Sequence, residues 1–464
     1  MLKAQILIGT GALLAGTMAV AREKSPNVLI FIADDLGWEE VGAYGHPVVK
    51  TPHVDWLAAH GLRFDNFYLA ASSSSPSRSA ILSGMYPCCT AARNLHEDMP
   101  PYISLFTDRL HDHGYHTMLV GKSHGTNNPT LRARFDQVSL VDWSRPWEMA
   151  DLWLEALKQR PREKPFFLFA ASIDPHRPYK QGSYAHPYSP DDVVVPPYLQ
   201  DSPEMREELA DYYNEISRFD DHVGQVLEAL GKEGELDNTL IIVMSDNGRP
   251  FPQCKTRMNV QGLRSPFIVY YPAMVKGGGV TSSLASAVDI APTILDIVGI
   301  RRSAALQGVS LRPVLEEPTR RVRSYAFAEH DWHVFRAYER AVVTEEFIYV
   351  RNWLPHLSNP SVGESMRMPA YKRMLADYQA GTLPPEMSDC FVCPRAAEEL
   401  YAVPTDRHCM HDLRGDPAFG ATLERLRLVL DVWQQSIGDL FPGEQRLKPD
   451  NADRLTGDPL KKKK

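Results

Sequence analysis

Residues 72–84, SSSSPSRSAILSG, join a serine-rich turn to the start of a helix. Pro76 fixes the turn, and the run after it predicts a helix that ends at Gly84. Ser74 would then lie near the N-terminus of this helix, where backbone N–H groups and the helix dipole favour an anion. Arg78, on the first turn, could hold an oxyanion by charge-assisted hydrogen bonds. A serine-rich turn alone is also typical of an ordinary polar loop, so the other motifs have to decide its meaning.

The composition of the whole chain is that of a globular protein. It has 464 residues, of which 44% are hydrophobic and 23% charged, enough for one large core with a smaller appended unit or for two domains. A formal net charge of -8 without a basic stripe argues against a nucleic-acid partner. The basic block at 461–464 ends the chain, and we interpret residues 456–464 as a disordered tail.

The N-terminus has the pattern of an export signal. Lys3 precedes an apolar run that extends to Val20, and Ala19-Val20-Ala21 matches a small-residue cleavage site. We interpret residues 1–21 as a cleaved signal rather than a stable membrane anchor, because no second apolar segment of spanning length follows. The expected location is periplasmic or secreted. The six cysteines fit such a compartment, and the Cys390-x-x-Cys393 spacing favours a local disulfide or free thiols over a zinc site.

Buried strand patterns alternate with helical patterns over the first two thirds of the chain. We predict strands at 27–33, 116–120, 166–172, 240–244 and 267–271, and helices at 51–60, 104–113, 146–159, 203–231 and 285–298. This alternation predicts an α/β fold with a mainly parallel sheet flanked by helices. A hairpin at 340–351 and a helix at 423–433 predict a smaller C-terminal antiparallel sheet with one covering helix. The expected units are 22–322 and 323–455.

Four of the predicted strands are followed at once by polar side chains. Any one of these clusters could be an ordinary turn. Ligands of open α/β sheets bind outside the carboxyl ends of the strands, so four such clusters are expected to converge on one site. They are Asp34 with Asp35, Lys122 with His124, Asp174 with His176, and Asp246 with Asn247.

The converging groups are of two chemical kinds. The side chains of Asp34, Asp35, Asp246 and Asn247 offer only oxygen ligands, which suit Ca²⁺ or Mg²⁺ and are poor for zinc. The alternative is that Asp34 caps a helix and that Asp246 and Asn247 belong to a turn. The other groups are cationic or titratable and match a tetrahedral oxyanion on a substrate. They are Arg78, Lys122, His124, His176 and Lys255.

Taken together, these motifs resemble those of the sulfatase family. The first stretch fits the family signature Cys/Ser-x-Pro-Ser-Arg-x-x-Leu-x-Thr/Ser-Gly from Ser74 to Gly84, with Ile81 in the place of leucine. The resemblance covers nearly the whole mature chain. The further matches are Ala33-Asp34-Asp35-Leu36-Gly37, Gly121-Lys122-Ser123-His124, Asp174-Pro175-His176-Arg177-Pro178, Ser245-Asp246-Asn247-Gly248, Lys255, and Gly262-Leu263-Arg264-Ser265-Pro266.

The resemblance implies an alkaline-phosphatase-like fold and a serine-type sulfatase. Ser74 would be converted to formylglycine by a dedicated maturation enzyme. Calcium, rather than magnesium, would be held by Asp34, Asp35, Asp246, Asn247 and the modified Ser74. The segments 94–98, 174–177 and 246–252 are most similar to the heparan N-sulfatase (N-sulfoglucosamine sulfohydrolase) branch. Two positions depart from that branch: Ser74 replaces its usual cysteine, and Lys255 stands where the branch can carry arginine.

The activity that the resemblance implies is hydrolysis of a sulfate ester or sulfamate on a sugar or polysaccharide. The hydrated aldehyde at position 74 would attack sulfur, with His176 as general acid and His124 as the group that removes a proton from the hydrate. Arg78, Lys122 and Lys255 would neutralise charge on the sulfuryl oxygens. The alternatives are a phosphomonoester or phosphodiester hydrolase with unmodified Ser74, and a non-catalytic glycan-binding relative. Sugar contacts are expected from His96, Asp98, Asp174, Arg177, His330 and His333.

Overall fold

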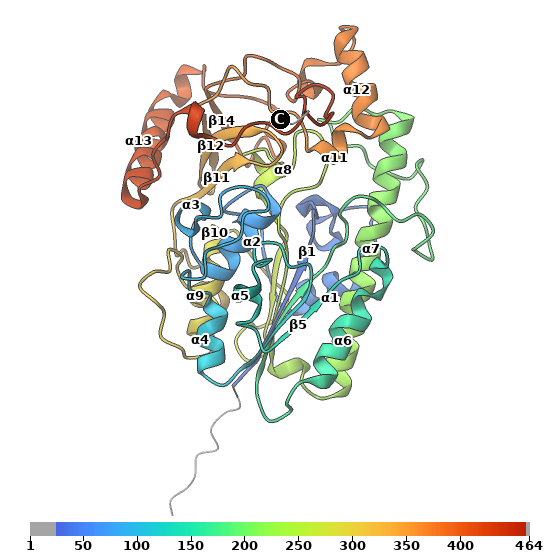
Figure 1. Ribbon diagram of the computed structural model, residues 1–464, viewed down its shortest axis with the longest axis vertical. Helices are drawn as coiled ribbons and strands as arrows, with labels where there is room; N and C mark the ends of the chain where they lie inside the picture. The colour runs from blue at the N-terminus through green and yellow to red at the C-terminus, as the bar shows by residue number, and fades with distance from the viewer. Residues whose placement is uncertain (1–24, 461–464) are drawn as a thin grey trace, which may run out of the picture.

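The computed structural model describes residues 25–460 (Figure 1). The predicted export signal at 1–21 and the basic block at 461–464 lie outside these residues. The main sheet has eight strands, and its order is not that of the sequence. Across the sheet the strands are β5 (Gln137–Leu140), β4 (His116–Gly121), β6 (Phe166–Ala171), β1 (Asn27–Ala33), β7 (Thr239–Ser245), β8 (Phe267–Tyr270), β2 (Leu62–Phe64) and β9 (Gly279–Thr281).

The centre of this sheet is parallel, as the sequence predicted. Strand β1 pairs in parallel with both β6 and β7, and all seven of its residues are buried. Burial on both faces explains why β1 is a continuous apolar run without alternation. Strands β4 and β5 extend the parallel part, whereas β8 runs antiparallel to β7 and β2. The fold is therefore an α/β fold with a mixed, mostly parallel sheet.

Helices cover both faces of the main sheet (Figure 1). Leu29 and Phe31 of β1 share a core with α1 (Pro52–His60), α6 (Met149–Gln159) and α7 (Pro203–Lys232). Ile30 and Ile32 point the other way, into a core with α2 (Ser74–Ser83), α4 (Phe106–Asp112) and α9 (Ile290–Ile297). Shorter elements are α3 (Pro87–Thr90), α5 (Pro129–Arg132), α8 (Val260–Leu263), α10 (Arg312–Glu316) and the strand pair β3 (Phe67–Tyr68) with β10 (Ala285–Ser286).

Several predicted boundaries differ from the structure, and three of them have a clear local basis. Helix α7 passes Gly231 and ends at Lys232. The helix predicted at 285–298 begins instead as strand β10 and a short 3-10 turn, and α9 starts at Ile290, because Ser286 and Asp289 form a capping box there. Residues 456–460, which we assigned to the tail, are hydrogen-bonded to residues 451–453.

The C-terminal unit is an antiparallel sheet in the order β11 (Ala326–Trp332), β12 (Arg336–Val343), β13 (Phe347–Asn352), β14 (Glu398–Ala402). The predicted hairpin is confirmed, with Arg340 opposite Arg351. Leu426 and Leu430 of α13 (Gly420–Ile437) pack against this sheet, while α11 (Gly363–Met366) and α12 (Pro369–Gln379) lie between β13 and β14 in the chain. The sheet meets the segment that leads into α2 where Glu329 N–H donates to the Ala70 carbonyl.

Two further features concern the whole described chain. All six cysteines lie within residues 25–460 and none forms a disulfide there, which leaves free thiols. Between residues 25 and 460 we find no helix with the length and apolar character needed to span a membrane.

Candidate active site

The register of the parallel strands brings the predicted polar clusters together. Ala33, the last residue of β1, pairs with Ser245, the last of β7. On the other side, Gly121 at the end of β4 pairs with Ala171 at the end of β6. The residues that follow these four positions therefore start from one edge of the sheet, as the rule for open α/β sheets requires.

Four oxygen-bearing side chains meet at this edge. Asp34, Asp35, Asp246 and Asn247 are all fully buried. Asp35 turns the chain with a left-handed backbone (φ 74°), and its N–H donates to Asp246 Oδ1 at 3.2 Å. Asn247 Nδ2 donates to Asp35 Oδ1 at 2.6 Å. Buried carboxylates need charge partners or a cation, so this cluster is a site rather than a turn.

Ser74 belongs to the same cluster. It is the first residue of α2. As predicted, this helix ends at Gly84, whose backbone is left-handed. Its Oγ lies 2.8 Å from Asn247 Oδ1 and 3.5 Å from Asp34 Oδ1. The helix thus presents position 74 to the strand ends, although these residues are far apart in the sequence.

Three basic side chains neutralise the three carboxylates. Arg78 Nε lies 2.7 Å from Asp246 Oδ2, and Lys255 Nζ lies 2.6 Å from Asp35 Oδ1. Lys122 forms an ion pair with Asp34. Both terminal nitrogens of Arg78 are buried without a hydrogen-bond partner. Because an unpaired buried guanidinium nitrogen is costly, these N–H groups are suited to an anionic ligand.

The pKa values follow from this balance of burial and charge. Burial raises the pKa of Asp34, but Lys122, His176 and Arg78 together outweigh burial, and the pKa lies below its ordinary value. Asp35 behaves in the same way beside Lys255. Burial lowers the pKa of Lys255, yet Asp35 and the other nearby carboxylates together outweigh burial, and the pKa is raised. Asp34, Asp35 and Lys255 are therefore ionised at neutral pH.

The two predicted catalytic histidines lie beside the cluster. His176 Nε2 lies 3.8 Å from Asp35 Oδ2, and its side chain is 12% exposed. His124 follows Lys122, and its Nδ1 is buried without a hydrogen-bond partner. Burial and the nearby Lys122 charge hold the pKa of His124 far below its usual range, so its imidazole is neutral. All six predicted catalytic residues thus lie around one point.

The oxygen-rich group fits a divalent cation. One atom each of Asp34, Asp35 and His176 lie within 4.8 Å of one another. Asp35 Oδ2 is buried and accepts no hydrogen bond, so it has a free ligand position. Carboxylate oxygens that converge in this way are typical of a hard cation site.

Two predicted sugar contacts form ion pairs with α7. The Asp174 carboxylate forms a bidentate pair with Arg218 of α7, with Nε 2.9 Å from Oδ2. Arg177 Nη2 lies 2.9 Å from Glu208 Oε2, also on α7. Both charges are already paired in the core, where they help to hold α7. Asp174 also lines a cavity beside His176, so a sugar contact by these residues stays a prediction.

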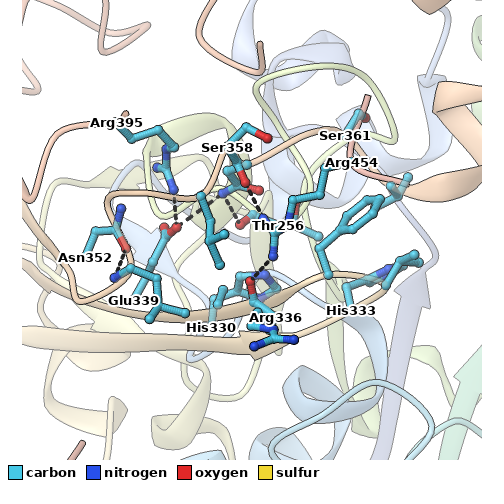
Figure 2. A pocket seen from close by; sticks show the side chains of 17 residues that line it. Thr256, His330, His333, Arg336, Glu339, Asn352, Ser358, Ser361, Arg395 and Arg454 are labelled. Atoms are coloured by element: carbon cyan, nitrogen blue, oxygen red, sulfur yellow. Dashed lines mark hydrogen bonds and ion pairs between the residues drawn. The ribbon is translucent and has the colours of Figure 1, made fainter. Parts of the chain in front are cut away.

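The two predicted contacts in the C-terminal unit, His330 and His333, lie in different surroundings. Figure 2 shows the pocket that both line, with Glu339 and Arg395 at one side and His333 at the other. His330 lies among arginines, and burial together with the Arg340 charge lowers its pKa to about 3, which indicates a structural role. His333 is buried with a free Nδ1, and burial and nearby Lys255 lower its pKa, so it adjoins the site.

The remaining predicted contacts come from the segment 94–98. His96 is exposed, its N–H donates to Ser75 Oγ at 2.8 Å, and its ring lies 5.0 Å from that of His124. Asp98 accepts a hydrogen bond from Asn127 N–H at 2.8 Å and so holds the loop that carries His124. His96 therefore lies at the mouth of the site, whereas Asp98 supports it.

One residue at the site was not predicted. Trp143 lies just after β5, beside His176 and Lys122. The only sequence signal was a tryptophan in a polar segment, and β5 itself, which is short and only partly buried, was missed.

A mostly parallel α/β sheet with a nucleophile-type helix terminus over buried carboxylates defines a hydrolase with the alkaline-phosphatase-like fold. The comparisons place it more narrowly. The sulfatase family model matches residues 26–300, and the model of the N-sulphoglucosamine sulphohydrolase C-terminal region matches residues 254–356. The chain belongs to the sulfatase family and is an enzyme of the sulfatase class, and the predicted closeness to the N-sulfoglucosamine sulfohydrolase branch is confirmed.

Individual relatives agree with this placement. The chain is 30% identical to the N-sulphoglucosamine sulphohydrolase of Homo sapiens, over 91% of this chain and 92% of that protein. It is 27% identical to an ulvan-active sulfatase of Formosa agariphila, over 90% and 76% of the two chains. A protein solved in complex with its substrate D-glucosamine-2-N,6-O-disulfate has the same fold, with a TM-score of 0.72 at 20% identity over 91% of this chain and 100% of that one.

Proposed function

We propose that this enzyme removes sulfate from a sulfate ester or sulfamate on a sugar, with a formylglycine derived from Ser74 and a bound Ca²⁺. One observation carries the proposal. Ser74 Oγ lies against Asn247 and Asp34, within a cluster of three buried carboxylates and three buried basic groups. The named substrates of the relatives, which include an N-sulphated sugar and the polysaccharide ulvan, support a sulfated carbohydrate.

The cation site would be formed by Asp34, Asp35, Asp246, Asn247 and position 74. A bound Ca²⁺ would supply charge stabilisation and a lowered pKa for a coordinated hydroxyl. The aldehyde at position 74, when hydrated, would supply the nucleophilic oxygen. These two groups define the chemistry, and the side chains around them determine how a sulfate group is held.

The basic residues would hold the sulfuryl group. The free terminal nitrogens of Arg78 can donate to two oxygens of a tetrahedral anion. Lys122 follows β4, and Lys255 lies in the loop after β7. Each pairs with a different carboxylate of the cluster, and both ammonium groups would contact the sulfuryl oxygens. Preorganised charges in a buried site stabilise the charge that develops on the oxygens during transfer.

The histidines would move the protons. His176 Nδ1 contacts the Arg177 carbonyl, which fixes an N–H there and leaves Nε2, on the side of Asp35, to carry the transferable proton. His176 is therefore the general acid for the leaving oxygen or nitrogen. His124, whose buried Nδ1 has no hydrogen-bond partner, would accept a proton from position 74. His96 and His333 would contact the sugar.

The proposal extends to maturation and export. Residues 1–21 would direct the chain to the periplasm or the exterior, and a formylglycine-generating enzyme would act on the segment around Ser74. The catalytic unit would comprise residues 22–322 and the appended unit residues 323–455, because the chain leaves the main sheet before β11.

The test compares the matured wild type with Ser74→Ala. Sulfate release from defined sulfated saccharides should be lost in Ser74→Ala, because the substitution removes the side chain that would form the nucleophile. Mass spectrometry of the wild-type peptide around Ser74 should show an alcohol oxidised to an aldehyde. Near-normal release by Ser74→Ala would refute the assignment. Ser74→Cys is the matched variant, since it restores the residue of the related branch.

The same experiment separates the alternatives. An unmodified Ser74 with good phosphate-ester hydrolysis would favour a phosphomonoester or phosphodiester hydrolase. A matured protein that binds the saccharides without releasing sulfate would favour a non-catalytic glycan-binding relative.

A further inference from the structure

An exposed tryptophan lies beside two of the catalytic candidates. Strand β5 pairs in parallel with β4, so the residues after β5 emerge at the same edge of the sheet as Lys122. Trp143 is one of them. Its ring centroid is 5.4 Å from that of His176 at an interplanar angle of 80°, and Lys122 Nζ lies 5.5 Å from the ring. Nevertheless, 42% of Trp143 is exposed.

Trp143 also lines a cavity next to the site. The cavity has a volume of about 230 Å³, below the range typical of drug-sized ligand pockets, so it suits one sugar ring rather than a longer segment. It connects the aromatic ring with the general-acid candidate. Its lining includes Trp143, Ser144, Pro146, Asp174, His176 and Lys180.

We propose that the sugar ring of the substrate, which bears the leaving oxygen or nitrogen, lies on the face of Trp143. This inference rests on the proposed function. The proton from His176 goes to the oxygen or nitrogen that leaves sulfur, and that atom is bonded directly to the sugar. The sugar carbon therefore lies one bond beyond an atom that is within hydrogen-bond distance of His176, and the Trp143 ring lies beside His176. The C–H groups on the face of a pyranose are attracted to the negative face of an aromatic ring.

The neighbouring Trp147 provides a matched control. It lies in the next turn of the same segment and is 48% exposed, but it is not among the residues that line the cavity. If exposed aromatic surface in this segment matters only for folding or solubility, both tryptophans should respond alike. If the cavity binds the sugar, only Trp143 should matter.

The experiment measures sulfate release by matured enzyme from N-sulfoglucosamine and glucosamine-6-sulfate, together with inhibition by inorganic sulfate. For Trp143→Ala we expect KM for the hydrolysed sugar to rise about tenfold, the loss of one aromatic contact and its buried area. Trp143→Phe should retain most of the affinity. Inhibition by inorganic sulfate, which lacks a ring, should change less than about twofold because the sulfuryl site is intact. Trp147→Ala should match wild type.

Three results would overturn the proposal. KM of Trp143→Ala within twofold of wild type would show that the sugar ring does not lie on Trp143. An equal weakening of inorganic sulfate would show that Trp143 supports Lys122 rather than the sugar. If wild type releases no sulfate from any sugar, the proposed function itself fails, and this is seen before any variant is compared.

Discussion

Asp35 combines a left-handed backbone with a fully buried carboxylate, and its Oδ2 accepts no hydrogen bond. Such a residue is destabilising unless something uses the free oxygen. Its other oxygen is engaged by Lys255 and Asn247. The position is therefore maintained for a ligand, and the cation is the ligand that suits it.

Calcium should consequently stabilise the folded protein. At a concentration one hundredfold above Kd, binding to the native state alone adds about 2.7 kcal/mol. For Asp35→Asn we expect the shift in the thermal midpoint between EDTA and CaCl₂ to shrink strongly, because a ligand charge is lost. Comparing each protein with and without calcium cancels the intrinsic stability of the variant. Asp142→Asn, an exposed acidic neighbour, should keep the full wild-type shift, and equal shifts in all three proteins would exclude this site.

His46 should make stability depend on pH. Its Nδ1 accepts hydrogen bonds from the N–H groups of Val48 and Val49, and its Nε2 contacts Tyr213 Oη at 3.1 Å. Burial, with a contribution from Arg249, lowers its pKa from 6.5 to about 4. The unfolded chain therefore takes up the proton first, so this stabilisation is complete above pH 6.5 and is lost as the pH falls to 4.

The variant His46→Asn isolates this effect. An asparagine oxygen can accept from the same turn without titrating. Between pH 6.5 and 4, wild type should lose about 3 kcal/mol more unfolding free energy than His46→Asn. Urea unfolding at several pH values measures the difference, and parallel curves for the two proteins would contradict the assignment.

That the polar residues after the strands meet at one place could be predicted, because residues that follow parallel strands must share one edge. Their pairing with partners that are distant in sequence could not. Asp174 and Arg177 look like free charges in the sequence, but α7 supplies Arg218 and Glu208 to pair them. Trp143 was missed because its position depends on β5, whose pairing with β4 has no strong periodic signal.

Among the elements, the end of β4 is the most constrained. Gly121 has φ 111°, and a Cβ there would lie 1.8 Å from the Ala171 carbonyl oxygen. The same oxygen accepts the N–H of Lys122. A side chain at position 121 would therefore push apart the ends of β4 and β6 and move Lys122 with them.

Gly121→Ala should accordingly lose both stability and activity. We expect a loss of about 3 kcal/mol or more, since a backbone clash adds to the strain of a left-handed alanine. Gly114→Ala is the control, because Gly114 also has a positive φ (88°) but nothing lies within 4 Å of its Cβ. That variant should lose only about 1 kcal/mol. Urea unfolding and sulfate release measure the two effects, and similar losses in both variants would contradict the clash.

The predictability of an element depends on how its burial appears in the sequence. Strands β1, β6 and β7 were predicted because burial on both faces makes them continuous apolar runs. Helix α2 is the opposite case, since all ten of its residues are buried although half of them are serines. Strands β11 and β14 were missed because they carry Glu329, Asp331 and Glu399, whose charges are paired only in the folded unit.

At the scale of the whole molecule, a charge network centred on a buried arginine of the C-terminal sheet reaches the catalytic unit through Arg93. Arg340 of β12 is fully buried and lies 2.5 Å from Asp439 and 2.8 Å from Asp331. Arg93, which precedes the segment with His96, pairs with the same two carboxylates. The two units therefore share a charge network next to the active site, and we expect them to unfold together.

Replacing one arginine tests this coupling. Arg340→Met leaves buried carboxylates without their main partner, so we expect a loss of about 3–5 kcal/mol in a single transition. Arg351→Met is the matched control, because Arg351 lies directly opposite on β13 but pairs with the partly exposed Asp431, and such pairs contribute less than about 1 kcal/mol. Urea unfolding followed by near-UV circular dichroism and by calcium-dependent sulfate release reports on both units. Equal losses in the two variants, or a C-terminal unit that melts while sulfate release persists, would show that the network does not hold the units together.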